Sequence, residues 1–160
     1  MHNRIDLGKF IEDQSNERYK SFIVLANILT FTEDIKEKII DSVEGNHLDL
    51  IQIFKSNREL SKNIDVFDVD NLKSLLNQSD NNSEIIFVTG LDMIWNIWTD
   101  FEKNRFVKMI EKDTISSPFS NKLYCFFMIK DQYISQIELL NTYGKSRVVP
   151  IDKFIIRGTI

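Results

Sequence analysis

The stretch that decides the fold is Glu84-Ile85-Ile86-Phe87-Val88-Thr89-Gly90-Leu91-Asp92. It is a short run of β-branched and aromatic residues that stops abruptly at Thr-Gly-x-Asp, a pattern typical of a buried parallel strand. Open α/β sheets place their sites at the carboxyl ends of such strands. We therefore expect a central strand over 84–89, with polar side chains gathered just beyond it.

Further apolar runs predict the other strands of this sheet. Residues 21–26 and 123–129 read as buried strands, and the second is apolar on both faces and therefore central. Residues 147–151 predict a last strand. The run 48–54 predicts another strand, although a helical interpretation fits so short a run nearly as well. A short strand is also expected over 64–67.

Helical patterns separate these runs. Thr32 is expected to open a helix in which Ile35, Ile39 and Val43 are spaced four apart, with Gly45 at its end. Other helices are expected over 5–13, over 100–113, over 131–142, and from Asp68 or Asp70 through Leu72, Leu75 and Leu76. Alternating strands and helices imply right-handed crossovers. The sequence thus predicts a single α/β domain over 1–160, with its core at about 20–151. Its sheet is expected to be open and mostly parallel, with about five strands and helices on both faces.

Composition is that of an ordinary soluble globule, with 42% hydrophobic and 28% charged residues in a chain of 160. The single Cys125 lies within a predicted buried strand, so we expect a reduced thiol and a cytoplasmic location. The amino terminus has no apolar leader, and no uncharged run approaches the length of a membrane span. Export and membrane insertion are not expected.

Charge is unevenly distributed along the chain. The net charge of -4 argues against a protein that coats nucleic acid. Residues 121–160 nevertheless hold six Lys or Arg against three Asp or Glu, which gives +3 there and -7 in the remainder. Lys145 and Arg147 are therefore candidates for contact with phosphate or with an acidic partner. Ordinary solvated surface charge is the alternative interpretation.

Complete catalytic motifs are missing from the sequence. Gly144-Lys145-Ser146 has Leu139 where a phosphate loop needs its first glycine, and it follows a predicted helix, so it reads as a turn. His2 and His47 lack ligand spacing, and Cys125 lacks a base. Glu111-Lys112 lies at a helix end and not on the strand that a restriction-type nuclease requires. We expect no catalytic residues, no metal and no cofactor.

Large apolar residues follow the 84–89 strand where a connection is ordinarily polar. Met93, Trp95 and Trp98 are candidates for a partner-binding surface, because tryptophan is prominent among interface hot spots. The alternative is that both indoles cover the core. Glu102 and Arg105 are expected to form a local, partly buried ion pair on the following helix.

The order of predicted elements over about 20–151 resembles the core of the P-loop NTPases. In that family an acid after the Walker B strand helps to hold magnesium, and the matching residue here is Asp92, three residues later than usual. The connection Asn27-Ile28-Leu29-Thr30-Phe31-Thr32 has neither the glycines nor the lysine of a phosphate loop. The resemblance therefore implies a degenerate core, a pseudo-NTPase in which Asp92 is a vestigial acid.

A second resemblance is to small accessory proteins of BREX-type phage-defence operons. It is carried by Val88-Thr89-Gly90, Trp95, Leu123 to Ile129 and Arg147. Together these patterns favour a non-catalytic, protein-binding subunit of a multi-component bacterial system, with antiviral defence as its setting. Two alternatives stay open: a nucleotide-dependent enzyme or switch that uses Asp92, and a nucleic-acid-binding adaptor that uses the basic carboxyl-terminal quarter.

Overall fold

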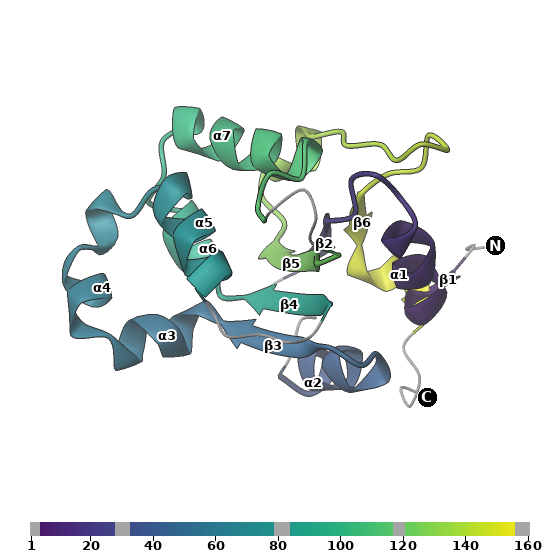
Figure 1. Cartoon of the computed structure of the whole chain (residues 1–160), viewed down its shortest axis with the longest axis horizontal. Helices are drawn as coiled ribbons and strands as arrows, with labels where there is room; N and C mark the ends of the chain where they lie inside the picture. The colour runs from purple at the N-terminus through teal and green to yellow at the C-terminus, as the bar shows by residue number, and fades with distance from the viewer. Residues whose placement is uncertain (1–3, 28–32, 79–83, 117–120, 156–160) are drawn as a thin grey trace.

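A five-stranded parallel sheet forms the centre of the computed structural model, which describes residues 4–27, 33–78, 84–116 and 121–155 (Figure 1). The strand order is β3-β4-β5-β2-β6. The strands are β2 (Phe22–Ala26), β3 (Asn46–Asp49), β4 (Ile85–Thr89), β5 (Leu123–Ile129) and β6 (Val148–Pro150). A second, two-stranded parallel sheet pairs β1 (Ile5–Asp6) with β7 (Phe154–Ile155). The predicted α/β domain with an open parallel sheet is confirmed.

The three runs predicted to be buried strands lie inside the sheet. Strands β2, β4 and β5 each have a neighbour on both sides, whereas β3 and β6 form the edges. In β5, Tyr124 and Phe126 pack into the apolar core on one face of the sheet, and Cys125 and Phe127 pack into the core on the other. Alternate side chains of a strand point to opposite faces, so a strand covered on both faces must be apolar throughout.

Helices cover both faces. On one face lie α5 (Val69–Gln78), α6 (Asp92–Trp95) and α7 (Asp100–Glu111), and on the other lie α1 (Leu7–Ser15) and α2 (Glu33–Ser42) (Figure 1). The predicted helices after Asp68 and over 100–113 are confirmed. Thr32, the expected start of the second helix, lies outside the described residues. Among the helices of the described residues, none combines the length and apolar character needed to cross a bilayer.

Two strand predictions in the first half need correction. The run 48–54 is divided between β3 and α3 (Leu50–Ser56), because the carboxylate of Asp49 accepts the amides of Ile51 and Gln52 at 3.0 and 3.4 Å and starts the helix there. A second short helix, α4 (Arg58–Lys62), follows. The predicted strand at 64–67 is a 3₁₀ turn (Ile64–Val66), in which the Phe67 amide bonds back to the Ile64 carbonyl. Local hydrogen bonds thus prevail over strand pairing in both runs.

The helix predicted over 131–142 is wrong. Only Ile134–Gln136 is helical, as a single 3₁₀ turn. The rest of the segment bonds to the residues that follow it: the Asn141 amide donates to the Lys145 carbonyl at 2.8 Å, and the Arg147 amide donates to the Leu139 carbonyl at 2.6 Å. These bonds close a tight turn that delivers the chain to β6, and they exclude a helix that would use the same backbone groups.

Candidate functional site at the carboxyl edge of the sheet

The sheet changes winding direction between β2 and β5. From β2 the chain passes to α2 on one face, whereas from β5 it passes to Ile134 and Leu139, which are buried with α7 on the other. Ligands of open α/β proteins bind in the crevice at such a switch point, beyond the carboxyl ends of the strands. The carboxyl edge is therefore where a site is expected, and Asp92 lies at this edge as predicted.

Gly90 turns the chain from β4 into α6. Its φ of +82° belongs to the left-handed region, and a Cβ there would lie 3.0 Å from the backbone nitrogen of Ile51. Both constraints favour glycine. Thr89, just before it, is 4% exposed and shares a hydrogen bond of 2.6 Å with Nε2 of His47 on the edge strand β3. Burial lowers the pKa of His47, and the nearby Asp49 charge opposes that change.

The Asp92 carboxylate links the connection after β4 to the neighbouring strand β5. Its Oδ1 accepts the amide of Ile129 at 2.8 Å, which ties the start of α6 to the end of β5. Burial raises the pKa of this carboxyl, and the charge of Asp131 raises it further, while the hydrogen bond from Ile129 acts in the opposite direction. The predicted vestigial acid therefore has a structural partner within the described residues.

Asp131 is the second acid of the edge, and it was not among the predicted site residues. Its Oδ2 accepts the indole N–H of Trp95 at 2.6 Å, and its Oδ1 accepts the amide of Ile134 at 2.8 Å. An acid two residues after the end of a buried strand was the signal that would have found it. Asp92 and Asp131 thus form a carboxyl-edge cluster, in which both carboxylates accept N–H groups of the protein. Within the described residues, His, Cys, Asp and Glu form no group of three that could hold a metal ion.

Comparison of the chain with protein-family models, with curated proteins and with solved structures finds no match. Two carboxylates, a hydroxyl and an imidazole lie along the edge, and each has a hydrogen-bond partner inside the protein. These side chains therefore stabilise the connections that follow the strand ends.

The predicted partner surface at Met93, Trp95 and Trp98 needs correction. Trp95 is 1% exposed and Trp98 is 7% exposed, and both rings pack on Phe106 of α7. Only Met93 is partly accessible. The indoles cover the core because α6 lies directly against the sheet, so neither indole can be presented to a partner in this conformation.

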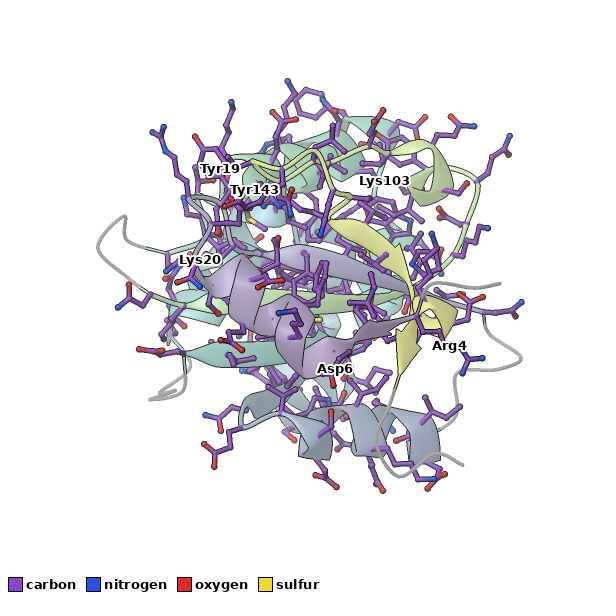
Figure 2. The ribbon with its side chains drawn as sticks, turned by 90° about the vertical axis from the view of Figure 1, so that its right-hand side faces the viewer. Arg4, Asp6, Tyr19, Lys20, Lys103 and Tyr143 are labelled. Atoms are coloured by element: carbon purple, nitrogen blue, oxygen red, sulfur yellow. The ribbon has the colours of Figure 1, made fainter. Side chains whose placement is uncertain are left out.

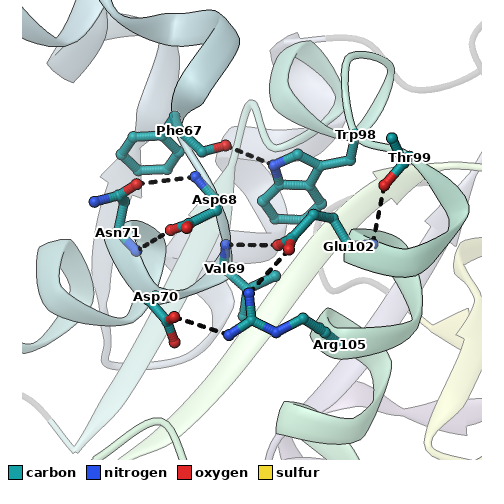
Figure 3. Close-up of polar contacts among 9 residues, drawn as sticks. All are labelled: Phe67, Asp68, Val69, Asp70, Asn71, Trp98, Thr99, Glu102 and Arg105. Atoms are coloured by element: carbon teal, nitrogen blue, oxygen red, sulfur yellow. Dashed lines mark hydrogen bonds and ion pairs between the residues drawn. The ribbon is translucent and has the colours of Figure 1, made fainter.

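A polar network fixes the second indole (Figure 3). The Trp98 Nε1 donates to the Phe67 carbonyl at 2.7 Å, which joins the start of α7 to the segment before α5. The expected ion pair between Glu102 and Arg105 is confirmed at 2.9 Å, and Arg105 also pairs with Asp70 of α5 at 2.8 Å. These acids hold the guanidinium and raise the pKa of Arg105. Arg105 therefore links α7 to α5.

Arg147 is the other predicted contact that needs correction. The side chain is 1% exposed and lies at the amino edge of the sheet, the opposite end from Asp92. Its guanidinium donates to the backbone carbonyls of Ser21, Ile110 and Glu111 at 2.6 to 3.2 Å. Arg147 thereby caps the carboxyl end of α7, where a cation is favourable. Burial lowers its pKa, and nearby acids oppose the change. It is not available to phosphate or to a partner.

Asp113 completes this amino-edge network. Its carboxylate accepts the amides of Lys20 and Ser21 and the hydroxyl of Ser21 at 2.7 to 3.2 Å. The Ser21 hydroxyl oxygen in turn accepts the amide of Tyr124, so the network links the starts of β2 and β5. Lys145, by contrast, is exposed, on the turn that precedes β6. Of the two predicted basic contacts, only Lys145 is accessible.

Proposed function

We propose that this protein is a non-catalytic, protein-binding subunit of a multi-component bacterial system. Its fold resembles a P-loop core that has lost nucleotide binding, and phage defence is the setting that the second resemblance suggests. The observation that carries the proposal is the position of β2. This strand ends at the switch point of the sheet, where a phosphate loop would follow, and residues 27–32 contain neither glycine nor lysine.

The edge acids support the same proposal. A magnesium ion bound with nucleotide needs carboxylate oxygens free to face it. Asp92 instead accepts the amide at the end of β5, and Asp131 accepts an indole and an amide. Large apolar side chains are exposed elsewhere: Phe101 is 73% exposed and Tyr143 is 83% exposed. Exposed aromatic residues are typical anchors of protein interfaces.

Nucleotide titration tests the loss of nucleotide binding. A ligand that binds only the native state adds about 2.7 kcal/mol of stability at one hundred times its dissociation constant. We expect neither Mg-ATP nor Mg-GTP to raise the melting temperature of the purified protein. A magnesium-dependent rise that Asp92→Asn abolishes would overturn the proposal and favour a nucleotide-dependent enzyme or switch.

Purification from the native host tests the role in protein binding. We expect the tagged protein to co-purify with a partner protein in near-stoichiometric amounts, and to keep that partner after nuclease treatment. A protein that elutes alone would contradict the proposal. Recovery of nucleic acid in place of protein would favour the adaptor alternative.

A further inference from the structure

A groove of about 850 Å³ lies between α1 and the segment 141–150, at the opposite end of the molecule from α4 (Figure 1). Its floor is apolar and includes Phe10 and Val149, which belong to the same core and are 7% and 5% exposed. Ligand sites commonly have this size, an apolar lining and a few polar groups. None of these residues takes part in the carboxyl-edge cluster or in the amino-edge network.

The two walls of the groove are held together by buried side chains. Gln14 of α1 is 1% exposed; its Oε1 accepts the side-chain Nδ2 of Asn141 at 3.1 Å, and its Nε2 donates to the Lys20 carbonyl at 3.3 Å. Glu17, 8% exposed, accepts the hydroxyl of Thr142. A site whose walls are already fixed loses less entropy when it binds. The groove is therefore preorganised.

The rim is rich in cations. Lys9, Arg18, Lys145 and Lys153 line it with exposed side chains. None of the three lysines makes an ion pair within the residues that the structure describes. The acids that line the groove are Asp13 and Glu17, and Glu17 is already bonded to Thr142. In a chain of net charge -4, this groove is locally positive.

An exposed aromatic residue stands at the same rim. Tyr143 is 83% exposed and lies on the side of the molecule that bears α1 (Figure 2). The Oδ1 of Asn141 accepts the amides of Tyr143 and Lys145, both at 2.9 Å, which fixes the turn that carries them. A turn with a fixed backbone that presents tyrosine beside lysine is suited to an interface, because little backbone freedom remains to be lost on binding.

The free edge of β6 is closed to strand addition. The hydroxyl of Ser146 donates to the Val148 carbonyl at 2.9 Å and accepts the Val148 amide at 3.1 Å. Pro150, the last residue of the strand, has no N–H to offer. An edge protected in this way resists pairing with another strand. The occupant of the groove must therefore be recognised through its side chains.

We infer that this groove binds an acidic segment of a partner protein, one that places an apolar side chain on the floor and carboxylates at the lysine rim. The inference rests on the proposed function and names the chemistry of the partner. Charge complementarity selects the carboxylates, and the apolar floor selects the anchor. A nucleic acid strand fits less well, because it has no apolar side chain to fill the floor, even though a base could stack on the exposed ring of Tyr143 at the rim.

Defined peptides test the inference. The probe is N-acetyl-Glu-Leu-Glu-Phe-Glu-Leu-Glu-amide, and two matched probes replace every Glu by Lys, or every Leu and Phe by Ser. In ¹H–¹⁵N spectra we expect the first probe alone to shift amides of residues 9–18 and 141–153, and added salt to weaken the effect. Shifts elsewhere, or equal shifts with all three probes, would overturn the inference. So would tighter binding in the groove of a single-stranded oligonucleotide.

Charge reversal supplies the control. Lys9→Glu combined with Lys145→Glu should weaken binding of the acidic probe by about tenfold or more. Lys62→Glu, on α4 at the far end of the molecule, should leave binding unchanged (Figure 1). If the double variant folds and still co-purifies with the native partner in full amount, the groove is not the docking site but the proposed function stands. If no partner co-purifies with the wild type, the proposed function itself fails.

Discussion

The two edges of the central sheet satisfy backbone groups with different charged side chains: acids at the carboxyl edge, and an acid together with a cation, Asp113 and Arg147, at the amino edge. At the carboxyl edge, the carboxylates of Asp92 and Asp131 accept N–H groups at strand and helix ends. At the amino edge, the guanidinium of Arg147 donates to three backbone carbonyls. Carboxylates only accept and guanidinium only donates, so each edge has the groups that complement the backbone atoms it must satisfy. Polar residues at a sheet edge are therefore not evidence of a ligand site until their partners are known.

The edges differ in how deeply the charge is buried. Arg147 is almost fully enclosed, whereas Asp92 is partly accessible. We therefore expect substitutions at the two edges to lower the free energy of unfolding by different amounts and with different pH dependence. Three variants measure the contributions of an apolar, a cationic and an acidic side chain to stability.

Trp95→Ala should have the largest effect. The indole is 1% exposed and packs on Trp98, Phe106 and Tyr133, so its removal leaves a large cavity and should cost about 3–5 kcal/mol of unfolding free energy. Urea unfolding measures this loss. Phe101→Ala, at a site that is 73% exposed, is the control and should change stability by less than about 0.5 kcal/mol. If the Trp95→Ala protein is stable but no longer binds its partner, Trp95 belongs to a partner-binding surface, as the sequence predicted.

Arg147→Met should have the next largest effect. Methionine keeps much of the apolar volume but removes the guanidinium donor from the carbonyls of Ser21, Ile110 and Glu111, of which Ile110 keeps the amide of Asp113, and this should cost about 3 kcal/mol. Lys145→Met, on the exposed turn two residues earlier, should be nearly neutral in the same urea titration. Equal and small losses in both variants would mean that the amino-edge network contributes little to stability.

Asp92→Asn should have the smallest effect at any one pH, within about 1 kcal/mol, because asparagine keeps an oxygen that accepts the Ile129 amide. Its signature is the pH dependence. Burial raises the pKa of Asp92 in the folded state above the unfolded value. The wild type therefore gains stability from this group below the unfolded pKa and loses it as pH rises through the folded pKa.

Urea titrations from mildly acidic to neutral pH measure this dependence. The stability of Asp92→Asn relative to the wild type should increase as pH rises. A relative stability that falls with pH would mean that the ionised carboxylate of Asp92 is the favoured form. The edge would then be a better place for a cation than its geometry indicates.

The sequence predicted the sheet better than the connections, for a physical reason. The strands at 84–89 and 123–129 are apolar on both faces, and few structures other than a central parallel strand accommodate such runs. The segment 131–142 has helical spacing, but its backbone bonds to 145–147, a contact that spacing does not encode. The division of the run 48–54 depended on the capping carboxylate of Asp49, whose Oδ1 accepts the amides of Ile51 and Gln52.

The candidate sites were predicted less well because burial was the deciding quantity. The position of Asp92 followed from the end of β4, but its bond to Ile129 depended on where β5 lies. Trp95 and Arg147 are amphipathic or charged residues whose exposure depends on the tertiary fold. The groove joins α1 to residues more than 120 positions later in the chain, a distance over which local pattern carries no information.

The position of β2 within the strand order also determines when this strand can pair during synthesis of the chain. Its two neighbours in the sheet, β5 and β6, begin at residues 123 and 148, so an apolar strand made early has no partner until most of the chain exists. At about 5–20 residues per second, translation leaves it unpaired for roughly 5–20 s. Pairings between such distant segments also form slowly. A nascent chain of this topology is a natural client for chaperones that shield apolar segments on the ribosome.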